Sequence, residues 1–205
     1  MSPADRTRAR RHLCRSDPVL ATVIRRVGPC GLVPHEDEDL FELLLRAIAS
    51  QQLSARAGQT IHGRVLALLP PGGPPRAADL LTLTPDQLRS TGLSRMKCAF
   101  VHDLARHVVT GGLDLAGLRG LPDAEVVAAL TRVKGIGRWS AEMFLIFSLG
   151  RPDVLPVDDV GVLRAVQQLY GLRIRPDVRR LERLAQPWQP WRSVACWYLW
   201  RMLDA

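Results

Sequence analysis

The chain has 205 residues, 47% of them hydrophobic and 23% charged, a composition typical of an ordered globular protein and not of a disordered one. Its net charge of +8 and pI near 10.3 favour a polyanionic partner such as nucleic acid, although a basic protein without that partner would have the same charge. It has no apolar run of the roughly 18 residues that span a membrane and no secretory signal, so we expect a cytoplasmic protein that does not bind membranes.

The first part of the chain predicts a basic start followed by two helices. Arginines are concentrated in residues 6–15, which predicts either a phosphate-binding arm or a frayed, solvated helix. Ser16-Asp17-Pro18 then opens a helix toward Val27, with a polar cap and a proline in its first turn. The next helix begins in the acidic run 36–39 and ends near Gln51, with its apolar residues on one face.

The middle of the chain predicts further helices and one linker. A helix over 54–69 stops at the proline- and glycine-rich residues 70–75, where we expect two lobes to hinge. Thr84-Pro85-Asp86-Gln87 has the pattern of a capping box and starts a short helix that ends at Gly92. A longer helix follows over residues 94–110.

The last part predicts helices over 122–132, 138–149, 159–170, 176–185 and 190–203. No segment has the sustained apolar and polar alternation of a half-buried strand, so we predict an all-α protein. The four cysteines, Cys14, Cys30, Cys98 and Cys196, form no Cys-x-x-Cys pair and predict buried thiols, with no readable zinc or iron–sulfur site.

A glycine-rich turn, Val133-Lys134-Gly135-Ile136-Gly137, joins two of these helices. Its glycines permit backbone angles that side chains would block, and main-chain N–H groups at the start of the next helix suit a phosphate. A helix end with a tight turn would give the same pattern for structural reasons alone. The turn by itself therefore leaves DNA binding open.

Four segments together carry a resemblance: LTRVKGIGRWSA at 130–141, LPVDDV at 155–160, IASQQLS at 48–54 and PWRS at 190–193. The first two resemble the helix-hairpin-helix DNA glycosylase superfamily, and the last two resemble its 3-methyladenine glycosylase II branch. The resemblance implies a two-lobed helical fold with a DNA cleft between the lobes and a hairpin over 124–149. Residues 34–205 would form the glycosylase core, and residues 1–33, a basic arm and first helix, would pack with the C-terminal helices. We expect no N-terminal α/β domain, which larger bacterial members carry.

The family resemblance also implies a catalytic aspartate at the start of a helix. A fixed carboxylate stabilises the positive charge that builds on the sugar as the N-glycosidic bond breaks. Asp158 and Asp159 both precede a predicted helix, where an aspartate is often only an N-cap. The family register favours Asp159, and Asp158 stays the alternate.

Members that also nick the strand have a lysine two residues after the second hairpin glycine, and this chain has Trp139 there. The resemblance therefore implies a monofunctional enzyme that removes alkylated bases by hydrolysis and leaves an abasic site. It places Trp139 and Trp200 around the flipped base, with Met143 where the best-known members have tyrosine. In a helical protein tryptophans are also ordinary core residues, and for Trp188, Trp191 and Trp197 we favour that interpretation.

Further expectations concern DNA contacts. Within the hairpin they fall on five consecutive residues, Lys134, Gly135, Ile136, Gly137 and Arg138. Gln52, with Leu53 close behind, corresponds to the wedge that fills the space of the flipped base, although a polar helix end before a buried leucine would look the same. The resemblance also implies a structural monovalent cation on the main-chain carbonyls of Thr131, Val133 and Gly135, and no other cofactor.

Two rival interpretations stay open at this stage. A non-catalytic helix-hairpin-helix DNA-binding protein would need only the hairpin and the positive charge. A glycosylase for oxidised or deaminated bases is the other, although such enzymes usually carry the lysine or a four-cysteine cluster. The partner that we expect is double-stranded DNA with a damaged base, bound by a monomer associated with the nucleoid.

Overall fold

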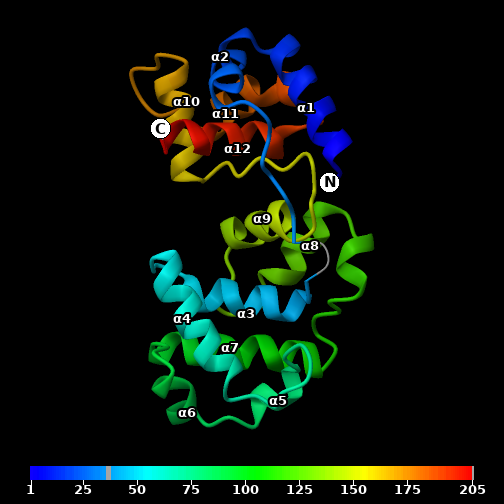
Figure 1. Ribbon diagram of the computed structural model, residues 1–205, viewed down its shortest axis with the longest axis vertical. Helices are drawn as coiled ribbons and strands as arrows, with labels where there is room; N and C mark the ends of the chain where they lie inside the picture. The colour runs from blue at the N-terminus through cyan, green and yellow to red at the C-terminus, as the bar shows by residue number, and fades with distance from the viewer. Residues whose placement is uncertain (36–37, 205) are drawn as a thin grey trace. The chain divides into compact units, whose positions relative to one another are not determined.

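The structure is a computed structural model that describes residues 1–35 and 38–204 and divides into two compact units. Unit 1 comprises Met1–Glu36 and Leu145–Ala205, and unit 2 comprises Asp37–Phe144. The described residues contain helices and no β-strand, which confirms the all-α fold class (Figure 1). None of these helices combines the length and apolar character required to cross a bilayer.

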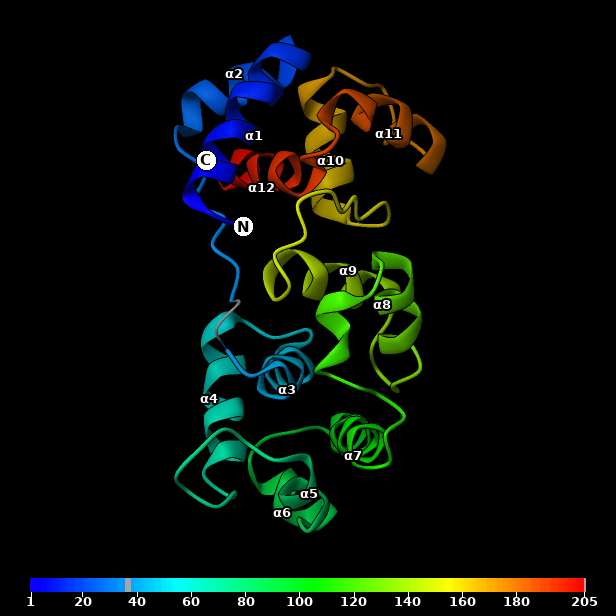
Figure 2. The ribbon, with the colours of Figure 1, turned by 90° about the vertical axis from the view of Figure 1, so that its right-hand side faces the viewer.

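Unit 1 brings the two ends of the chain together around helix α12 (Arg192–Leu203). This helix packs against α1 (Pro3–Ser16), α2 (Pro18–Val27) and α10 (Val160–Leu169), as Figure 2 shows. The unit is completed by α11 (Val178–Ala185) and a 3-10 turn, Gln186–Trp188. The N-terminal helices contact α12 and the 3-10 turn, and the predicted boundary at 33/34 stays a prediction.

Asp17 lies at the centre of the unit 1 core and is 6% exposed. It caps α2 by accepting the Leu20 N–H, and it also accepts hydrogen bonds from the Trp188 indole and the Tyr170 hydroxyl. A buried carboxylate is tolerated when its oxygens are fully hydrogen-bonded. Trp188 is fully buried, as we expected of a core tryptophan.

The arginine-rich start of the chain is a packed helix. Ser2 and Asp5 form a capping box at its beginning, and Ala9 and Leu13 are fully buried. Helix α1 contacts α2 and α12. Residues 6–15 therefore form a packed helix and not a frayed one.

Unit 2 is built around α7 (Arg95–Val109), which packs against α3 (Leu40–Ser50), α5 (Ala77–Leu81) and α6 (Pro85–Ser90). Helix α4 (Ala55–Leu66) packs on α3. A 3-10 turn, Gly117–Gly120, leads to α8 (Asp123–Leu130), and α9 (Arg138–Phe147) follows. The predicted capping box at Thr84 is present, because Thr84 and Gln87 bond each other's main-chain N–H groups.

Two predictions in this region need correction or qualification. The proline-rich residues 70–75 lie inside unit 2, so they are not the hinge between lobes, and the short helix α5 after them was not predicted. Glu36 and Asp37, part of the acidic run expected to open α3, lie outside the described residues. Asp39 caps that helix by accepting the Glu42 N–H.

Candidate functional site

The candidate catalytic carboxylate, Asp159, lies at the start of α10 in unit 1. Its Oδ1 atom accepts the main-chain N–H of Val162 at 2.7 Å and the indole Nε1–H of Trp200 at 2.9 Å. Asp159 is 7% exposed, whereas Asp158 is exposed to solvent. The helix cap and the candidate catalytic carboxylate are thus the same residue.

Trp200 holds its position through a second aromatic contact. Its ring stacks on Phe147 with a centroid distance of 5.7 Å and an interplanar angle of 29°. The indole nitrogen points at Asp159 while one ring face lies against Phe147. In this structure Trp200 therefore orients the carboxylate, a contact that the sequence did not indicate.

Gly161 makes this arrangement possible, and sequence reasoning missed it. A Cβ atom at Gly161 would lie 3.0 Å from Oδ1 of Asp159 and 3.1 Å from Cδ1 of Trp200. The available signal was a glycine in the first turn of a helix, where glycine costs about 1 kcal/mol relative to alanine. A residue that weakens its own helix suggests that close packing requires it.

The PWRS segment at 190–193 anchors the loop that leads to Asp159. The Arg192 guanidinium donates to both carboxylate oxygens of Asp153, at 2.7 Å and 2.9 Å. The buried Ser193 hydroxyl accepts the Val154 N–H and donates to the Arg151 carbonyl. Helix α12 therefore holds the segment 151–159 at two places, with Arg192 and Ser193 near its start and Trp200 near its end.

The hairpin turn in unit 2 depends on Gly135 for two independent reasons. Its φ is +85°, a left-handed value that side chains disfavour, and a Cβ there would lie 2.2 Å from Cδ2 of Phe100. Gly137 differs, because a Cβ at that position would meet no atom within 4 Å. Gly135 is thus required by the fold, whereas any requirement for Gly137 comes from a ligand outside the chain.

Asp103 of α7 anchors the same turn from below. Its Oδ2 accepts the Lys134 main-chain N–H at 2.9 Å, and Asp103 is 6% exposed. The Ile136 N–H bonds the Val133 carbonyl, so this amide and that of Lys134 are occupied. Among the described hydrogen bonds none uses the N–H of Gly135 or Gly137, and the side chains of Lys134 and Arg138 are exposed. The Arg138 guanidinium pairs with the Glu142 carboxylate at 2.8 Å, so the two glycine amides and the Lys134 side chain are the groups available to a phosphate.

The carbonyls predicted to hold a monovalent cation are partly occupied. Gly135 O accepts a hydrogen bond from Gln51 Nε2 at 2.8 Å, and Val133 O accepts the Ile136 N–H at 3.1 Å. Two of the three carbonyls, with Thr131 as the third, therefore already have a protein donor. A carbonyl oxygen has two lone pairs, so one hydrogen bond still allows it to bind a cation. The cation site stays a prediction, and no step of the chemistry below depends on it.

The candidate wedge lies in a strained turn between α3 and α4. Gln52 has φ +57° and is the one non-glycine residue with positive φ in the described parts of the chain. Its side chain is exposed, and Leu53 is 43% exposed, so this leucine is not the buried residue of a simple helix end. Both side chains are presented to solvent at a turn that costs energy to maintain, a feature common at functional positions.

Lys97 holds this turn and was not identified from the sequence. Its ammonium group donates to the carbonyls of Ala49 at 2.8 Å and Gln51 at 2.6 Å, at the negative end of α3. Burial lowers the pKa of Lys97 below its ordinary value. Lys97, Phe100 and Asp103 follow each other at intervals of three along α7, so one helix face supports both the wedge turn and the hairpin.

The predicted base-pocket residues divide between the units. Trp139 is in the first turn of α9 and 48% exposed, and Met143, half-buried, follows one turn later, both in unit 2. Trp200 belongs to unit 1 with Asp159. An indole as exposed as that of Trp139 is not a core residue.

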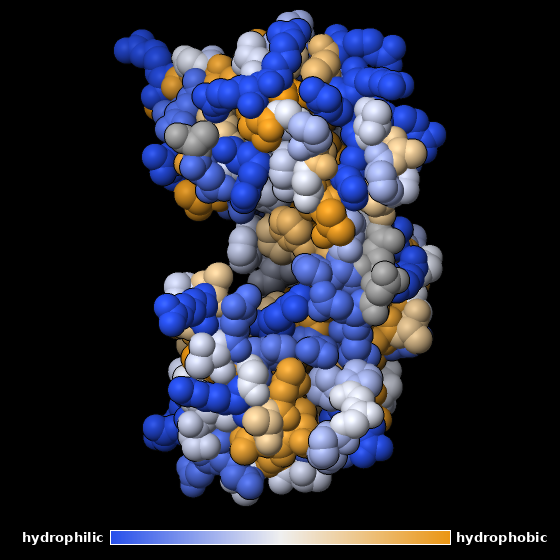
Figure 3. Space-filling model, in the orientation of Figure 1, coloured by the Kyte–Doolittle hydropathy of each residue, from blue (hydrophilic) through white to orange (hydrophobic). Residues whose placement is uncertain are grey.

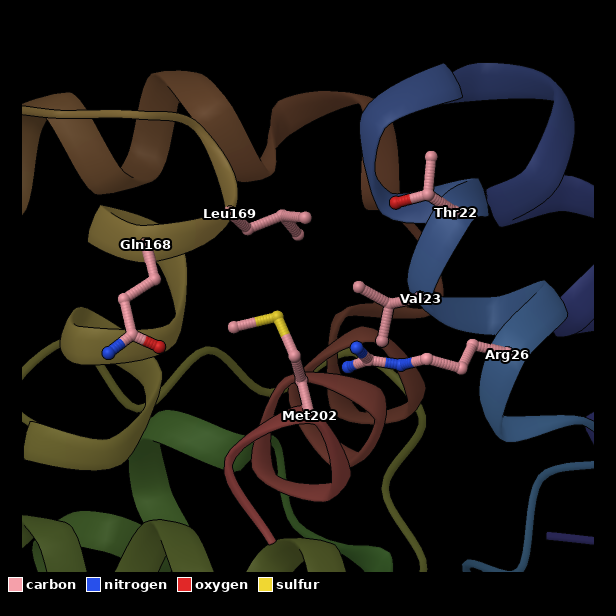
Figure 4. Close-up of a pocket in the computed structure, with 6 residues that line it drawn as sticks. All are labelled: Thr22, Val23, Arg26, Gln168, Leu169 and Met202. Atoms are coloured by element: carbon pink, nitrogen blue, oxygen red, sulfur yellow. The ribbon is translucent and has the colours of Figure 1, made fainter. Parts of the chain in front are cut away.

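A hollow of about 490 Å³ lies elsewhere in unit 1, between α2, α10 and α12. Figure 4 shows Arg26 and Met202 directed into it, with Gln168 and Leu169 on the α10 side. These α10 residues lie at the opposite end of the helix from Asp159. The hollow contains none of the predicted site residues, so it does not mark the catalytic position.

Comparison with known proteins places these features in a family. Residues 45–190 match the model of the HhH-GPD superfamily base excision DNA repair protein. The alkylbase DNA glycosidase-like protein mag2 of Schizosaccharomyces pombe is 30% identical, over 97% of this chain and 94% of that protein. Two solved structures also resemble the chain over most of its length.

The first is a 3-methyladenine DNA glycosylase of Schizosaccharomyces pombe in complex with abasic DNA, with TM-score 0.85 and 30% identity over 97% of each chain. The second is a DNA-3-methyladenine glycosidase from Bacillus halodurans. Its TM-score is 0.80 and its identity 37%, over 93% of this chain and 86% of that one. Both structures agree with the resemblance carried by the four sequence segments.

Proposed function

Because the chain belongs to the HhH-GPD superfamily of base excision DNA repair proteins, we propose that it is a DNA glycosylase that removes alkylated bases from double-stranded DNA. Its substrates are bases of the 3-methyladenine and 7-methylguanine type, and it acts as a monomer. The observation that carries the proposal is the buried Asp159 carboxylate, fixed by the Val162 N–H and the Trp200 indole.

The carboxylate supplies the electrostatic part of the reaction. As the bond between sugar and base breaks, positive charge develops on the sugar, and a negative group already held in place stabilises it without reorganising. The two hydrogen bonds described above fix the orientation of the Asp159 carboxylate, and its negative charge faces the developing positive charge. An alkylated purine carries positive charge and leaves as a neutral base, so no second carboxyl group is required to protonate it.

Hydrolysis, and not lyase chemistry, follows from the residue at position 139. A Schiff base with the sugar requires a lysine amine at that place, and Trp139 has none. Its exposed indole instead offers an electron-rich face to a cationic base. The hairpin amides of Gly135 and Gly137, with the Lys134 side chain, grip the DNA backbone without reading its sequence.

Release of bases from methylated DNA tests the proposal. Double-stranded DNA treated with a methylating agent is incubated with wild type, Asp159→Asn and, as the matched control, Asp158→Asn, and freed bases are identified by mass spectrometry. We expect wild type and Asp158→Asn to release methylated purines, and Asp159→Asn to lose about 10²-fold or more of the rate.

Two further readouts separate the rival functions. An Asp159→Asn protein with full activity would contradict the assignment of this carboxylate. Duplex binding by the wild type without any Asp-dependent base release favours a non-catalytic DNA-binding protein, whereas release of uracil or oxidised purines alone favours the other glycosylase class. A covalent adduct trapped by borohydride during turnover contradicts the hydrolytic mechanism.

A further inference from the structure

A group of arginines covers the outer side of α11 and the loop before it. The five residues are all exposed and are called the α11 arginine surface below: Arg173, Arg175, Arg179, Arg180 and Arg183. Figure 2 shows α11 at the outside of unit 1, and Figure 3 shows a largely hydrophilic surface over the loop that follows α10.

The helix geometry gathers three of these arginines on one face. Leu181 and Ala185 of α11 are fully buried and define its inner side. With about 100° between successive residues, Arg179, Arg180 and Arg183 fall on the opposite side of the helix. Arg173 and Arg175 extend the same positive surface into the preceding loop, on either side of the exposed Ile174.

These arginines have no internal task that would explain them. None of the five guanidinium groups forms an ion pair with a carboxylate within residues 1–35 and 38–204. Asp177, one of the two acids in this segment, caps α11 and accepts the Arg180 main-chain N–H. In α1, by contrast, Arg6 donates to the Leu32 carbonyl and Arg8 pairs with Asp5.

The positive charge of residues 173–183 favours binding to a polyanion. Residues 173–183 contain five arginines and two acids, Asp177 and Glu182, so their net charge is 5 − 2 = +3 out of +8 for the whole chain. Arginine is the residue best suited to phosphate, because its planar guanidinium donates two parallel hydrogen bonds. Uncompensated like charges repel each other, and a phosphate backbone relieves that repulsion while releasing counterions.

We propose that the α11 arginine surface is a second DNA-backbone contact, carried by unit 1 and separate from the hairpin in unit 2. It holds duplex DNA through phosphates and adds affinity independent of base sequence. The proposal rests on the proposed function in so far as DNA is the substrate, but it does not depend on Asp159 or on which base is removed.

The salt dependence of duplex affinity tests this proposal. The variant is Arg179→Gln/Arg180→Gln/Arg183→Gln, which keeps the side-chain stems, and the probe is an undamaged duplex. Each phosphate contact contributes about 0.9 to the slope of log affinity against log salt. We expect the slope to fall by about two to three, with single-turnover base release at saturating DNA unchanged within about twofold.

The matched control is Arg11→Gln/Arg15→Gln/Arg25→Gln, which removes the same charge from exposed residues spread over α1 and α2. It should change the slope by less than one. An equal fall of the slope in both variants overturns the proposal and means that general positive charge causes the effect. No fall in the α11 variant also overturns it and favours another partner, such as an acidic protein.

Folding and function are kept apart in the same experiment. Circular dichroism melts verify that each variant folds, and Arg173→Gln/Arg175→Gln tests the loop half of the surface should the helix variant unfold. A reduced slope together with a wild type that releases no base supports the second contact while contradicting the proposed glycosylase. An unchanged slope in the α11 variant together with normal base release by the wild type contradicts the second contact and supports the proposed glycosylase.

Discussion

The two units hold their functional groups in different ways. In unit 1 the proposed functional group is a side chain, the Asp159 carboxylate, which is fixed by a helix start and by the Trp200 indole. In unit 2 it is main chain, the hairpin turn, which is fixed from below by the Asp103 carboxylate and the Phe100 ring of α7. The Asp159 site therefore requires a glycine at position 161, where a side chain would not fit. The hairpin turn requires the buried side chains of α7 that support it.

This difference separates the expected consequences of mutation. Changes around Asp159 should alter the rate of base release and leave DNA binding nearly intact. Changes around the hairpin should alter DNA affinity and the stability of unit 2. Glycine substitutions provide the sharpest contrast, since each unit contains a glycine whose replacement by alanine adds a single carbon at a defined place.

Gly135→Ala should have the largest effect. Alanine at φ +85° costs about 1–2 kcal/mol, and displacing the Phe100 ring from a Cβ at 2.2 Å costs about 1–3 kcal/mol more. We expect a total destabilisation of about 2–5 kcal/mol and at least a tenfold loss of duplex affinity. Urea unfolding and fluorescence anisotropy measure the two quantities.

Gly137→Ala is the companion to this variant, since its Cβ meets no protein atom within 4 Å. Its free energy of unfolding should equal that of wild type within about 0.5 kcal/mol, while duplex affinity falls because a methyl group obstructs the phosphate. Wild-type affinity in Gly137→Ala would mean that DNA does not approach this glycine. Loss of stability in both variants would show that both glycines serve the fold.

Gly161→Ala should slow base release without weakening DNA binding. The added carbon would lie 3.0 Å from Asp159 Oδ1 and 3.1 Å from Trp200 Cδ1, so carboxylate and indole must move apart. Contacts this short require the neighbouring atoms to shift by a few tenths of an ångström. Since a displacement of about 1 Å at a reacting group costs about 10²-fold in rate, we expect a fall of about tenfold. Single-turnover base release measures this, and Gly63→Ala in α4, where a Cβ meets nothing within 4 Å, is the control.

The contrast also explains which features the sequence could predict. The hairpin, Asp159 and the capping boxes follow from local rules, because a turn, a helix start and their polar residues are neighbours in the chain. Asp159 was preferred over Asp158 from the register of the family, and the structure adds that Asp159 is the buried one. The helices were predicted for the same local reason, with α5 as an exception because five residues carry little periodicity.

The supporting residues were not predictable in this way. Lys97 and Asp103 bond to residues 48 and 31 positions away in the chain. Gly161 acts through the space that its missing side chain leaves for Asp159 and Trp200. A buried aspartate or lysine in an amphipathic helix has the same local pattern as a solvated one. The packing of α1 was missed for a related reason, because its five arginines conceal two fully buried residues, Ala9 and Leu13.

Trp200→Phe should have a moderate effect and decides how Trp200 acts. Phenylalanine keeps a ring to stack on Phe147 but loses the Nε1–H that donates to Asp159. A hydrogen bond to a charged group contributes about 1.5–3 kcal/mol, so we expect at least a tenfold fall in the rate of base release. Affinity for abasic DNA should be unchanged. Full activity in Trp200→Phe would instead mean that Trp200 works through its ring face, as a wall of the base pocket.

The smallest expected effect belongs to His62, a buried residue of α4 that faces Glu42 of α3 in unit 2. Burial, and then the positive charge of Arg46, lower the pKa of His62 below its ordinary value of 6.5, while Glu38 opposes this more weakly. The unfolded chain therefore binds a proton more readily than the folded one, and the free energy of unfolding falls as pH drops below 6.5. We expect His62→Leu to lose less free energy of unfolding than wild type between pH 7.5 and pH 5.5. Urea unfolding of both proteins at the two pH values measures this difference. An unaltered decline in this variant would place the acid sensitivity outside the α3 and α4 pair, and would remove the one pH-dependent difference that we expect between the units.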